Sequence, residues 1–176
     1  MGKTAVLYRS KYGSTGQYAK WIAEETGADL FRIPHVSVRD LARYDTIIVG
    51  GGLYAGGMLG ASFLKRNFAA IADKRIIVFS VGASFANEKN IAAIKARLLA
   101  PEMLSRVSFY HLRGALDYHA MKPLDRFAMR LLVSMIRRKP ESERDEEEKG
   151  IVATYGKSVT FLNRDSIAPI VREAMA

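Results

Sequence analysis

The chain has 176 residues, with 27 Lys and Arg against 18 Asp and Glu, a formal charge of +9 and no Cys. This length suits one α/β domain, and the lack of Cys excludes disulfides, Cys-based zinc or iron–sulfur sites and a thiol nucleophile. Hydrophobic residues make up 49% of the chain, which excludes general disorder. The positive charge favours an anionic partner, such as nucleic acid, anionic lipid or an acidic ligand; the alternative is a soluble protein that is simply basic.

Strand and helix patterns alternate through the first two thirds of the chain. Apolar, β-rich runs predict five strands, at residues 3–9, 28–33, 45–49, 75–81 and 106–112. Helical spacing predicts helices at residues 17–26, 61–72 and 90–99. Because strands and helices alternate, we expect an α/β fold in which helices cover both faces of a five-stranded parallel sheet.

The last third of the chain departs from this alternation. We expect an amphipathic helix at residues 124–138, a charged run at 140–149 and a final helix at 165–175. The charged run is interpreted as a solvated, mobile loop, with folding back onto the arginines as the alternative. We therefore expect one domain over residues 1–176 that carries a basic and acidic insert at about 119–149.

The loop after the first strand has the composition of a phosphate site. Residues 10–16 offer three Ser or Thr hydroxyls, two glycines and the free N–H groups of a helix start. Such N–H groups bind phosphate because the helix dipole favours negative charge there. The loop lacks the Gly-Lys-Ser/Thr ending of a P-loop and the Gly-x-Gly-x-x-Gly pattern of a dinucleotide site. The alternative is a Ser- and Gly-rich turn with a capping Ser.

Two further strand ends are rich in small residues. Gly50–Met58 contains Tyr54 as its one aromatic side chain, and Gly82–Phe85 follows the fourth strand. Since ligands bind at the carboxyl ends of parallel strands, we expect these loops to enclose a flat ring, on which Tyr54 stacks. The alternative for Tyr54 is a partly buried loop anchor. The stretch 114–118 joins this edge if the strand order is the usual one.

The chain resembles the flavodoxin family. The resemblance is carried by residues 6–15, by the strand 44–50 with its Gly-rich loop, and by residues 79–82. It implies FMN as the cofactor, with the first loop on the phosphate and the next two beside the isoalloxazine ring. The cofactor-binding residues that we predict are Ser10, Lys11, Tyr12, Gly13, Ser14, Thr15, Leu53, Tyr54, Ala55, Gly56, Gly82, Ala83, Ser84, Asp117 and Tyr118.

Within that superfamily the chain is most similar to the menaquinone-dependent protoporphyrinogen oxidase group. The similar stretches are residues 54–57, 114–118 and 124–132. This resemblance implies an FMN-dependent oxidoreductase that passes electrons from a substrate through flavin to a quinone-type acceptor. The alternatives are a flavodoxin that carries electrons between protein partners and a flavin-free adaptor. The flavin carries the chemistry in this hypothesis, so we name no catalytic side chain.

The amphipathic helix also suggests a partner. Residues 119–139 hold six Lys or Arg against one Asp, whereas residues 140–149 hold six acidic residues against two basic ones. An apolar face with a cationic stripe suits peripheral contact with a membrane through residues 124–138. The alternatives are packing on the same domain or on a second copy of the chain.

Other partners and sites find little support in the sequence. The Lys and Arg residues are dispersed, so we expect no nucleic-acid partner. The three His residues lack metal-ligand spacing, so we expect no metal site. Because the N-terminus runs directly into a strand, we expect no targeting segment. The lack of Cys fits a reducing cytoplasm, so we expect a cytoplasmic protein; membrane contact through the insert would place it on the inner face of the membrane.

Overall fold

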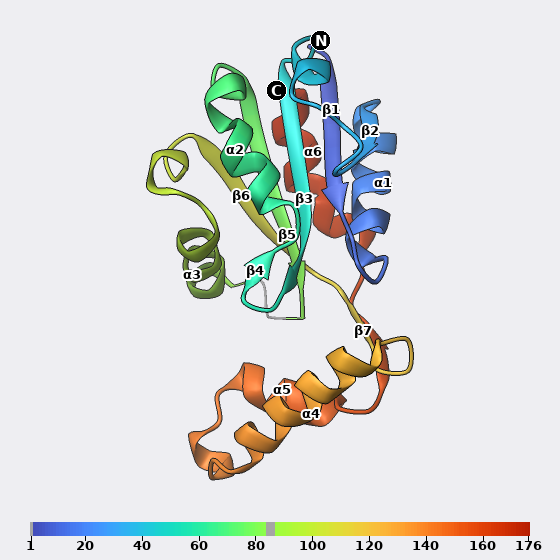
Figure 1. Cartoon of the computed structure of the whole chain (residues 1–176), viewed down its shortest axis with the longest axis vertical. Helices are drawn as coiled ribbons and strands as arrows, with labels where there is room; N and C mark the ends of the chain where they lie inside the picture. The colour runs from blue at the N-terminus through green and yellow to red at the C-terminus, as the bar shows by residue number, and fades with distance from the viewer. Residues whose placement is uncertain (1, 84–86) are drawn as a thin grey trace.

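A five-stranded parallel sheet forms the centre of the molecule (Figure 1). The computed structural model describes residues 2–83 and 87–176. The strands are β1 (Thr4–Arg9), β2 (Asp29–Arg32), β3 (Thr46–Tyr54), β5 (Arg75–Gly82) and β6 (Val107–Arg113), in the order β2-β1-β3-β5-β6. A short strand, β4 (Gly57–Met58), pairs antiparallel with the end of β3. The prediction of a parallel α/β sheet is confirmed.

Helices cover both faces of this sheet, as the alternation of elements predicts. Helices α1 (Ser14–Thr26) and α6 (Ala168–Met175) lie on one face, and α2 (Ala61–Ile71) and α3 (Glu88–Leu98) lie on the other. Successive residues of a strand point to opposite faces, so Val6 contributes to the first of these cores and Leu7 to the second. Each face of the sheet therefore has its own hydrophobic core.

Strand β3 is longer than predicted and reaches Tyr54. Its glycines stay paired with the neighbouring strands because, without side chains, they do not clash with the groups that pack against β3. A Cβ atom on Gly50 would lie 2.1 Å from Cζ of Phe79, and one on Gly51 would lie 2.2 Å from the backbone oxygen of Leu59. The glycines thus allow β3 to carry the chain to the edge of the sheet where the strands end.

Two helices form a lobe beyond the carboxyl ends of the strands (Figure 1). Strands β7 (Ala115–Asp117) and β8 (Ser158–Thr160) pair antiparallel and lead into and out of this lobe. Between them lie α4 (Pro123–Arg137) and α5 (Glu146–Thr154). Neither hydrophobic core contains a described residue from 115 to 161. The lobe therefore depends on other contacts for its position over the sheet.

The prediction of a mobile loop over the charged run is wrong. Helix α5 begins inside this run, and Asp145 and Glu148 form a capping box at its start. Nζ of Lys139 also lies 2.5 Å from Oε1 of Glu148. The physical reason is that an Asp followed three residues later by a Glu satisfies two free N–H groups, which stabilises a helix start despite the negative charge. Among the described residues, no helix is long and apolar enough to cross a bilayer.

Candidate functional site

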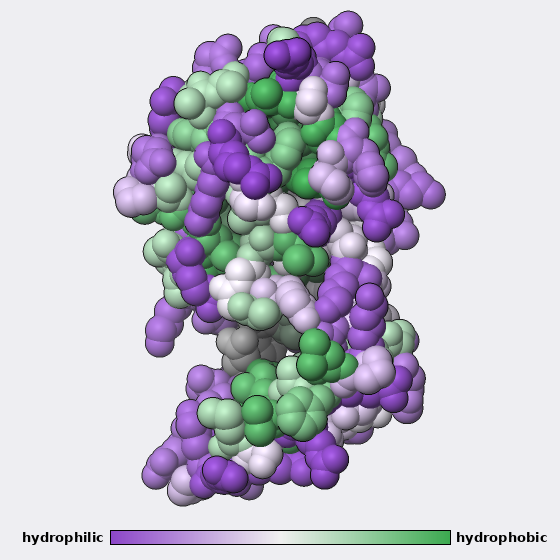
Figure 2. Space-filling view, in the orientation of Figure 1, coloured by the Kyte–Doolittle hydropathy of each residue, from purple (hydrophilic) through white to green (hydrophobic). Residues whose placement is uncertain are grey.

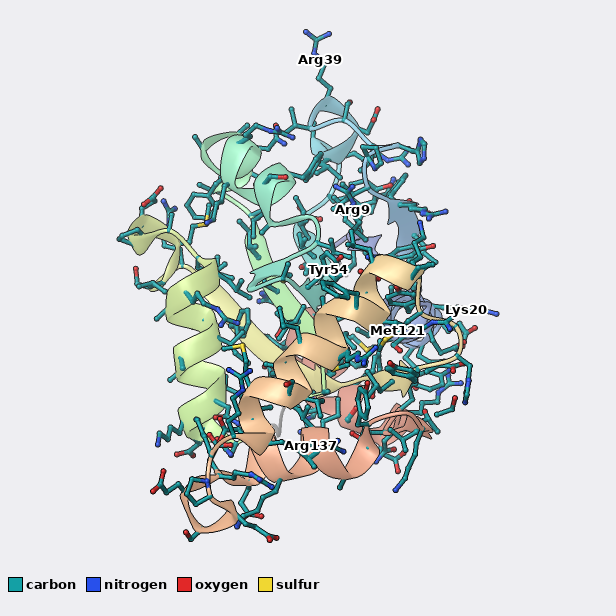
Figure 3. The ribbon with its side chains drawn as sticks, turned by 60° about the horizontal axis from the view of Figure 1, so that its bottom comes forward. Arg9, Lys20, Arg39, Tyr54, Met121 and Arg137 are labelled. Atoms are coloured by element: carbon teal, nitrogen blue, oxygen red, sulfur yellow. The ribbon has the colours of Figure 1, made fainter. Side chains whose placement is uncertain are left out.

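A cavity of about 370 Å³ lies where the strands of the sheet end. The ends of β1, β3, β5 and β6 contribute to its walls, and α4 closes one side (Figure 3). Small-molecule sites commonly have volumes of about 300 to 1,000 Å³. The cavity therefore has the size and the place in the sheet that a ligand site of a parallel α/β fold requires.

The loop after β1 brings a helix start to this cavity. Gly13 precedes α1 with φ of 98°, and no side chain caps the helix there. The hydroxyl of Ser10 accepts a hydrogen bond from the Gly13 N–H at 3.0 Å, and the hydroxyl of Ser14 accepts one from the Ala115 N–H at 3.1 Å. A helix start without a side-chain cap retains N–H groups that can bind an anion.

The ends of β3 and β5 form a narrow wall with little side-chain bulk. A Cβ atom on Gly52 would lie 3.3 Å from Oγ1 of Thr15, and one on Gly82 would lie 2.9 Å from Cδ1 of Leu53. These glycines therefore bring the backbone close to side chains of α1 and β3. Tyr54 stands at the end of this wall with 39% of its surface exposed. A flat apolar group fits between such backbone segments.

Helix α4 supplies the opposite wall. Ala128, Met129 and Leu132 line the cavity from this helix. Met121, which is labelled in Figure 3, lines it from the turn before the helix. These four side chains are apolar, and two of them are flexible Met side chains that adapt to the shape of a ligand. This wall covers one side of the cavity, which stays partly open to solvent.

One carboxylate of α4 reaches across to the loops. Oδ2 of Asp125 lies 2.7 Å from Nζ of Lys11, and Oδ1 accepts a hydrogen bond from the hydroxyl of Tyr54 at 2.6 Å. The hydroxyl of Tyr12 also donates to Asp125. These contacts favour the charged form and lower the pKa of Asp125 to about 2, chiefly through Lys11 and then through the tyrosines. The same ion pair raises the pKa of Lys11 above its usual value.

Most of the predicted cofactor-binding residues lie around this one cavity. The predicted residues that line it are Ser10, Lys11, Tyr12, Ser14, Thr15, Leu53, Tyr54, Ala55, Gly82 and Ala83. Gly13 precedes α1 and Gly56 occupies the turn after β3, both with positive φ, and neither lines the cavity. Ser84 lies outside the described residues.

Two predicted residues belong to the hairpin that supports the lobe. Oδ1 of Asp117 accepts a hydrogen bond from the Ser158 hydroxyl at 2.6 Å, and the Tyr118 hydroxyl donates to that of Tyr155 at 3.2 Å. Neither Asp117 nor Tyr118 lines the cavity. Their contacts hold the two strands of the hairpin and the start and end of the lobe together.

Sequence reasoning missed the contribution of α4 to the cavity. Asp125, Ala128, Met129 and Leu132 follow the i, i+3, i+4, i+7 spacing of one helix face, so the signal was present in the sequence. This spacing was hard to recognise because the bulkier apolar residues of the same helix lie on a different face. The other cavity residues that were not predicted are Gly52, Leu59, Val81, Gly114, Ala115, Leu116 and Met121.

Comparison with known proteins identifies the family. The family model described as a flavodoxin domain matches residues 5–143 of the chain. The chain belongs to the flavodoxin family. The sheet and its helices accordingly have the flavodoxin-like fold. Among the described residues of this flavodoxin-family protein, no group of three or more acidic or His side chains is placed to hold a metal ion.

Individual relatives of this flavodoxin-family protein are distant. An uncharacterized protein of Methanocaldococcus jannaschii is 33% identical over 79 residues, which cover 44% of this chain and 53% of that protein. Among solved structures, oxidised flavodoxin 2 of Bacillus cereus is 15% identical with a TM-score of 0.48, over 96% of this chain and 99% of its own. A flavoprotein of Lactobacillus acidophilus in complex with FMN is 16% identical with a TM-score of 0.39, over 64% and 93%.

Proposed function

We propose that this protein is an FMN-dependent oxidoreductase, related in activity to the menaquinone-dependent protoporphyrinogen oxidases. The observation that carries the proposal is the cavity itself, in which an uncapped helix start lies next to two glycine-rich strand ends and an apolar helix. Family membership supports a flavin as the ligand.

The polar end of the cavity fits the phosphate of FMN. The hydroxyls of Ser10, Ser14 and Thr15 line the cavity beside the start of α1. These residues would hold the phosphate, since hydroxyls and free N–H groups stabilise its charge. The carboxylate of Asp125 would repel a phosphate, but its ion pair with Lys11 at 2.7 Å neutralises it.

The apolar end of the cavity fits the ring system. Leu53 and Tyr54 would lie on one side of the ring, and Gly82 and Ala83 on the other. Bound FMN would supply the redox chemistry, while the chain binds, orients and shields it from water. Each two-electron oxidation of the substrate is balanced by reduction of one quinone to a quinol.

The wall formed by α4 favours an enzyme over an electron carrier. A carrier exchanges electrons with protein partners at an accessible edge of its cofactor. Here Ala128, Met129 and Leu132 cover one side of the cavity. This wall suits a small, flat and apolar reactant that enters the cavity, and it narrows the surface on which a protein partner could approach the cofactor.

FMN titration followed by a turnover assay tests the proposal. We expect the protein to quench FMN fluorescence on binding, and then to accelerate anaerobic electron transfer from protoporphyrinogen to a menaquinone analogue above the rate with free FMN. Absence of FMN binding would contradict the flavin function and favour the adaptor. Binding without turnover would reject this substrate, and two well-resolved one-electron reduction steps would then favour the carrier.

We also propose that α4 contacts an anionic membrane surface. Leu124, Phe127, Leu131 and Met135 are 73%, 64%, 55% and 59% exposed, and they form an apolar patch on the lobe (Figure 2). The same helix carries exposed Arg residues at 126, 130 and 137. Exposed apolar residues flanked by arginines suit an interface with anionic lipid. Such contact would place a cytoplasmic enzyme at the inner face of the membrane, close to a quinone.

A further inference from the structure

The lobe that contains α4 is attached to the sheet at one end by a hairpin. Strands β7 and β8 carry the chain into and out of the lobe, and the Gly114 N–H donates to the Gly82 carbonyl at 2.8 Å. The cores on the two faces of the sheet contain no described residue from 115 to 161. Because neither core extends into the lobe, its position over the cavity depends on contacts outside them, and polar contacts away from the hairpin are among these.

Asp125 makes such contacts with both sides of the cavity mouth. Lys11 and Tyr12 belong to the loop after β1, and Tyr54 belongs to the end of β3; all three side chains bond to the Asp125 carboxylate. The Lys122 N–H, just before α4, also donates to the Tyr12 hydroxyl at 3.3 Å. Nζ of Lys11 lies 3.7 Å from the centre of the Tyr54 ring, which joins the two loops to each other.

The burial of this carboxylate strengthens these contacts. The side chain of Asp125 is 9% exposed and that of Lys11 is 25% exposed, although both belong to elements at the surface. Charge-assisted hydrogen bonds that are shielded from water are stronger than exposed ion pairs. The rest of the inner face of α4 is apolar, and apolar contacts have no preferred direction, whereas the ion pair and hydrogen bonds of Asp125 do.

We propose that Asp125 is a positioning residue that holds α4 closed over the cavity and thereby controls the entry and release of the ligand. The inference rests on the proposed function only in naming FMN as that ligand. The ion pair with Lys11 and the hydroxyls of Tyr12 and Tyr54 form the closure, and the β7–β8 hairpin acts as the hinge. Opening requires these bonds to break while the hairpin stays paired.

A distance measurement tests the closure without any ligand. The chain has no Cys, so Lys65→Cys on α2 and Ser142→Cys in the lobe, both at exposed positions, accept two spin labels. In the labelled full chain we expect one narrow distance distribution for the Asp125 protein. We expect Asp125→Asn to broaden it toward longer distances, and Asp125→Glu, which keeps the charge, to restore most of the narrow distribution.

A matched control separates this role from a general effect of losing a carboxylate. Asp29 accepts a hydrogen bond from the Tyr44 hydroxyl at 2.6 Å and lies 3.5 Å from Nη2 of Arg43, at the opposite end of the sheet. Asp29→Asn should leave the distance distribution unchanged. An unchanged distribution in Asp125→Asn, or equal broadening in Asp29→Asn, overturns the proposal. Circular dichroism melting shows that each variant is folded.

The release rate of FMN gives a second measurement. We expect Asp125→Asn to release FMN about tenfold faster than the Asp125 protein, because the charge-assisted bonds that close the cavity are lost. Asp29→Asn should release it at the original rate. An unchanged release rate in Asp125→Asn argues against control of release. If the Asp125 protein binds no FMN at all, the proposed function fails, and the distance measurement still decides whether Asp125 holds the lobe closed.

Discussion

At the scale of single residues, the glycines of β3 determine whether the cavity wall can form. A Cβ atom on Gly51 would lie 2.2 Å from the Leu59 backbone oxygen and 2.5 Å from Cγ of Met58. Since backbone cannot move aside cheaply, we expect Gly51→Ala to lower the free energy of unfolding by about 2 kcal/mol in urea titrations.

A second glycine provides the control for this substitution. Gly150 lies inside α5, and a Cβ atom there would meet nothing within 4 Å. We expect Gly150→Ala to be neutral or stabilising by up to about 1 kcal/mol, because Ala favours a helix. Equal losses of stability in the two variants would show that the close approach at Gly51 is not the cause.

Asp125 also makes stability depend on pH at the residue scale. Lys11, Tyr12 and Tyr54 lower the pKa of this carboxyl from 3.8 to about 2, so the folded protein binds fewer protons than the unfolded chain in this range. The contribution of Asp125 to stability is therefore present above pH 3.8 and is lost as the pH falls toward 2. We expect the difference in urea midpoint between the original protein and Asp125→Asn to be larger at pH 6 than at pH 3. A constant difference would contradict the assigned ion pair.

At the scale of elements, α4 has two faces with different roles. The inner face lines the cavity, and Phe127 and Leu131 lie on the outer face with 64% and 55% exposure. We expect the double variant Phe127→Ser, Leu131→Ser to reduce sedimentation with anionic vesicles at least about tenfold, because two large apolar side chains no longer enter the lipid. FMN binding should stay the same.

Exposed leucines elsewhere offer a control for this experiment. Leu30 and Leu104 are 41% and 36% exposed and lie outside α4. Replacing both by Ser should leave vesicle binding unchanged. If this control variant loses binding equally, or if the original protein does not sediment with vesicles, α4 is not a membrane contact. A change of molecular mass in the Phe127 and Leu131 variant during analytical ultracentrifugation would instead indicate a contact between two copies.

The elements also show how far sequence reasoning reaches in this chain. The buried strands were predictable because runs such as Ile47, Ile48 and Val49 are apolar on both faces, as a covered parallel sheet requires. That the glycine- and serine-rich strand ends meet around one cavity was predictable because parallel strands end at one edge of the sheet. Strands β7 and β8 were not predictable, because each has only three residues and the residues that pair lie 41 to 45 positions apart in the sequence. The amphipathic pattern of α4 showed that the helix has an apolar side, but not which surface that side covers.

At the scale of the whole molecule, the protein consists of a sheet with two cores and a lobe that belongs to neither (Figure 1). Asp117 and Ser158 lie opposite each other at the point where the lobe begins and ends. An Asn-Gly turn joins antiparallel strands at such a position. Replacing residues 118–157 by Asn-Gly should therefore leave a sheet that still melts cooperatively, because its cores are intact.

The shortened protein separates the roles of the sheet and the lobe. The loops after β1, β3 and β5 remain, so we expect it still to quench FMN fluorescence. Without the apolar wall of α4 and the Asp125 closure, FMN release should be at least about tenfold faster, and sedimentation with vesicles should be lost. Failure to melt cooperatively would show that the lobe is part of the folding unit. An unchanged release rate would show that α4 does not cover the bound cofactor, since the sheet alone would then hold FMN as firmly as the complete chain.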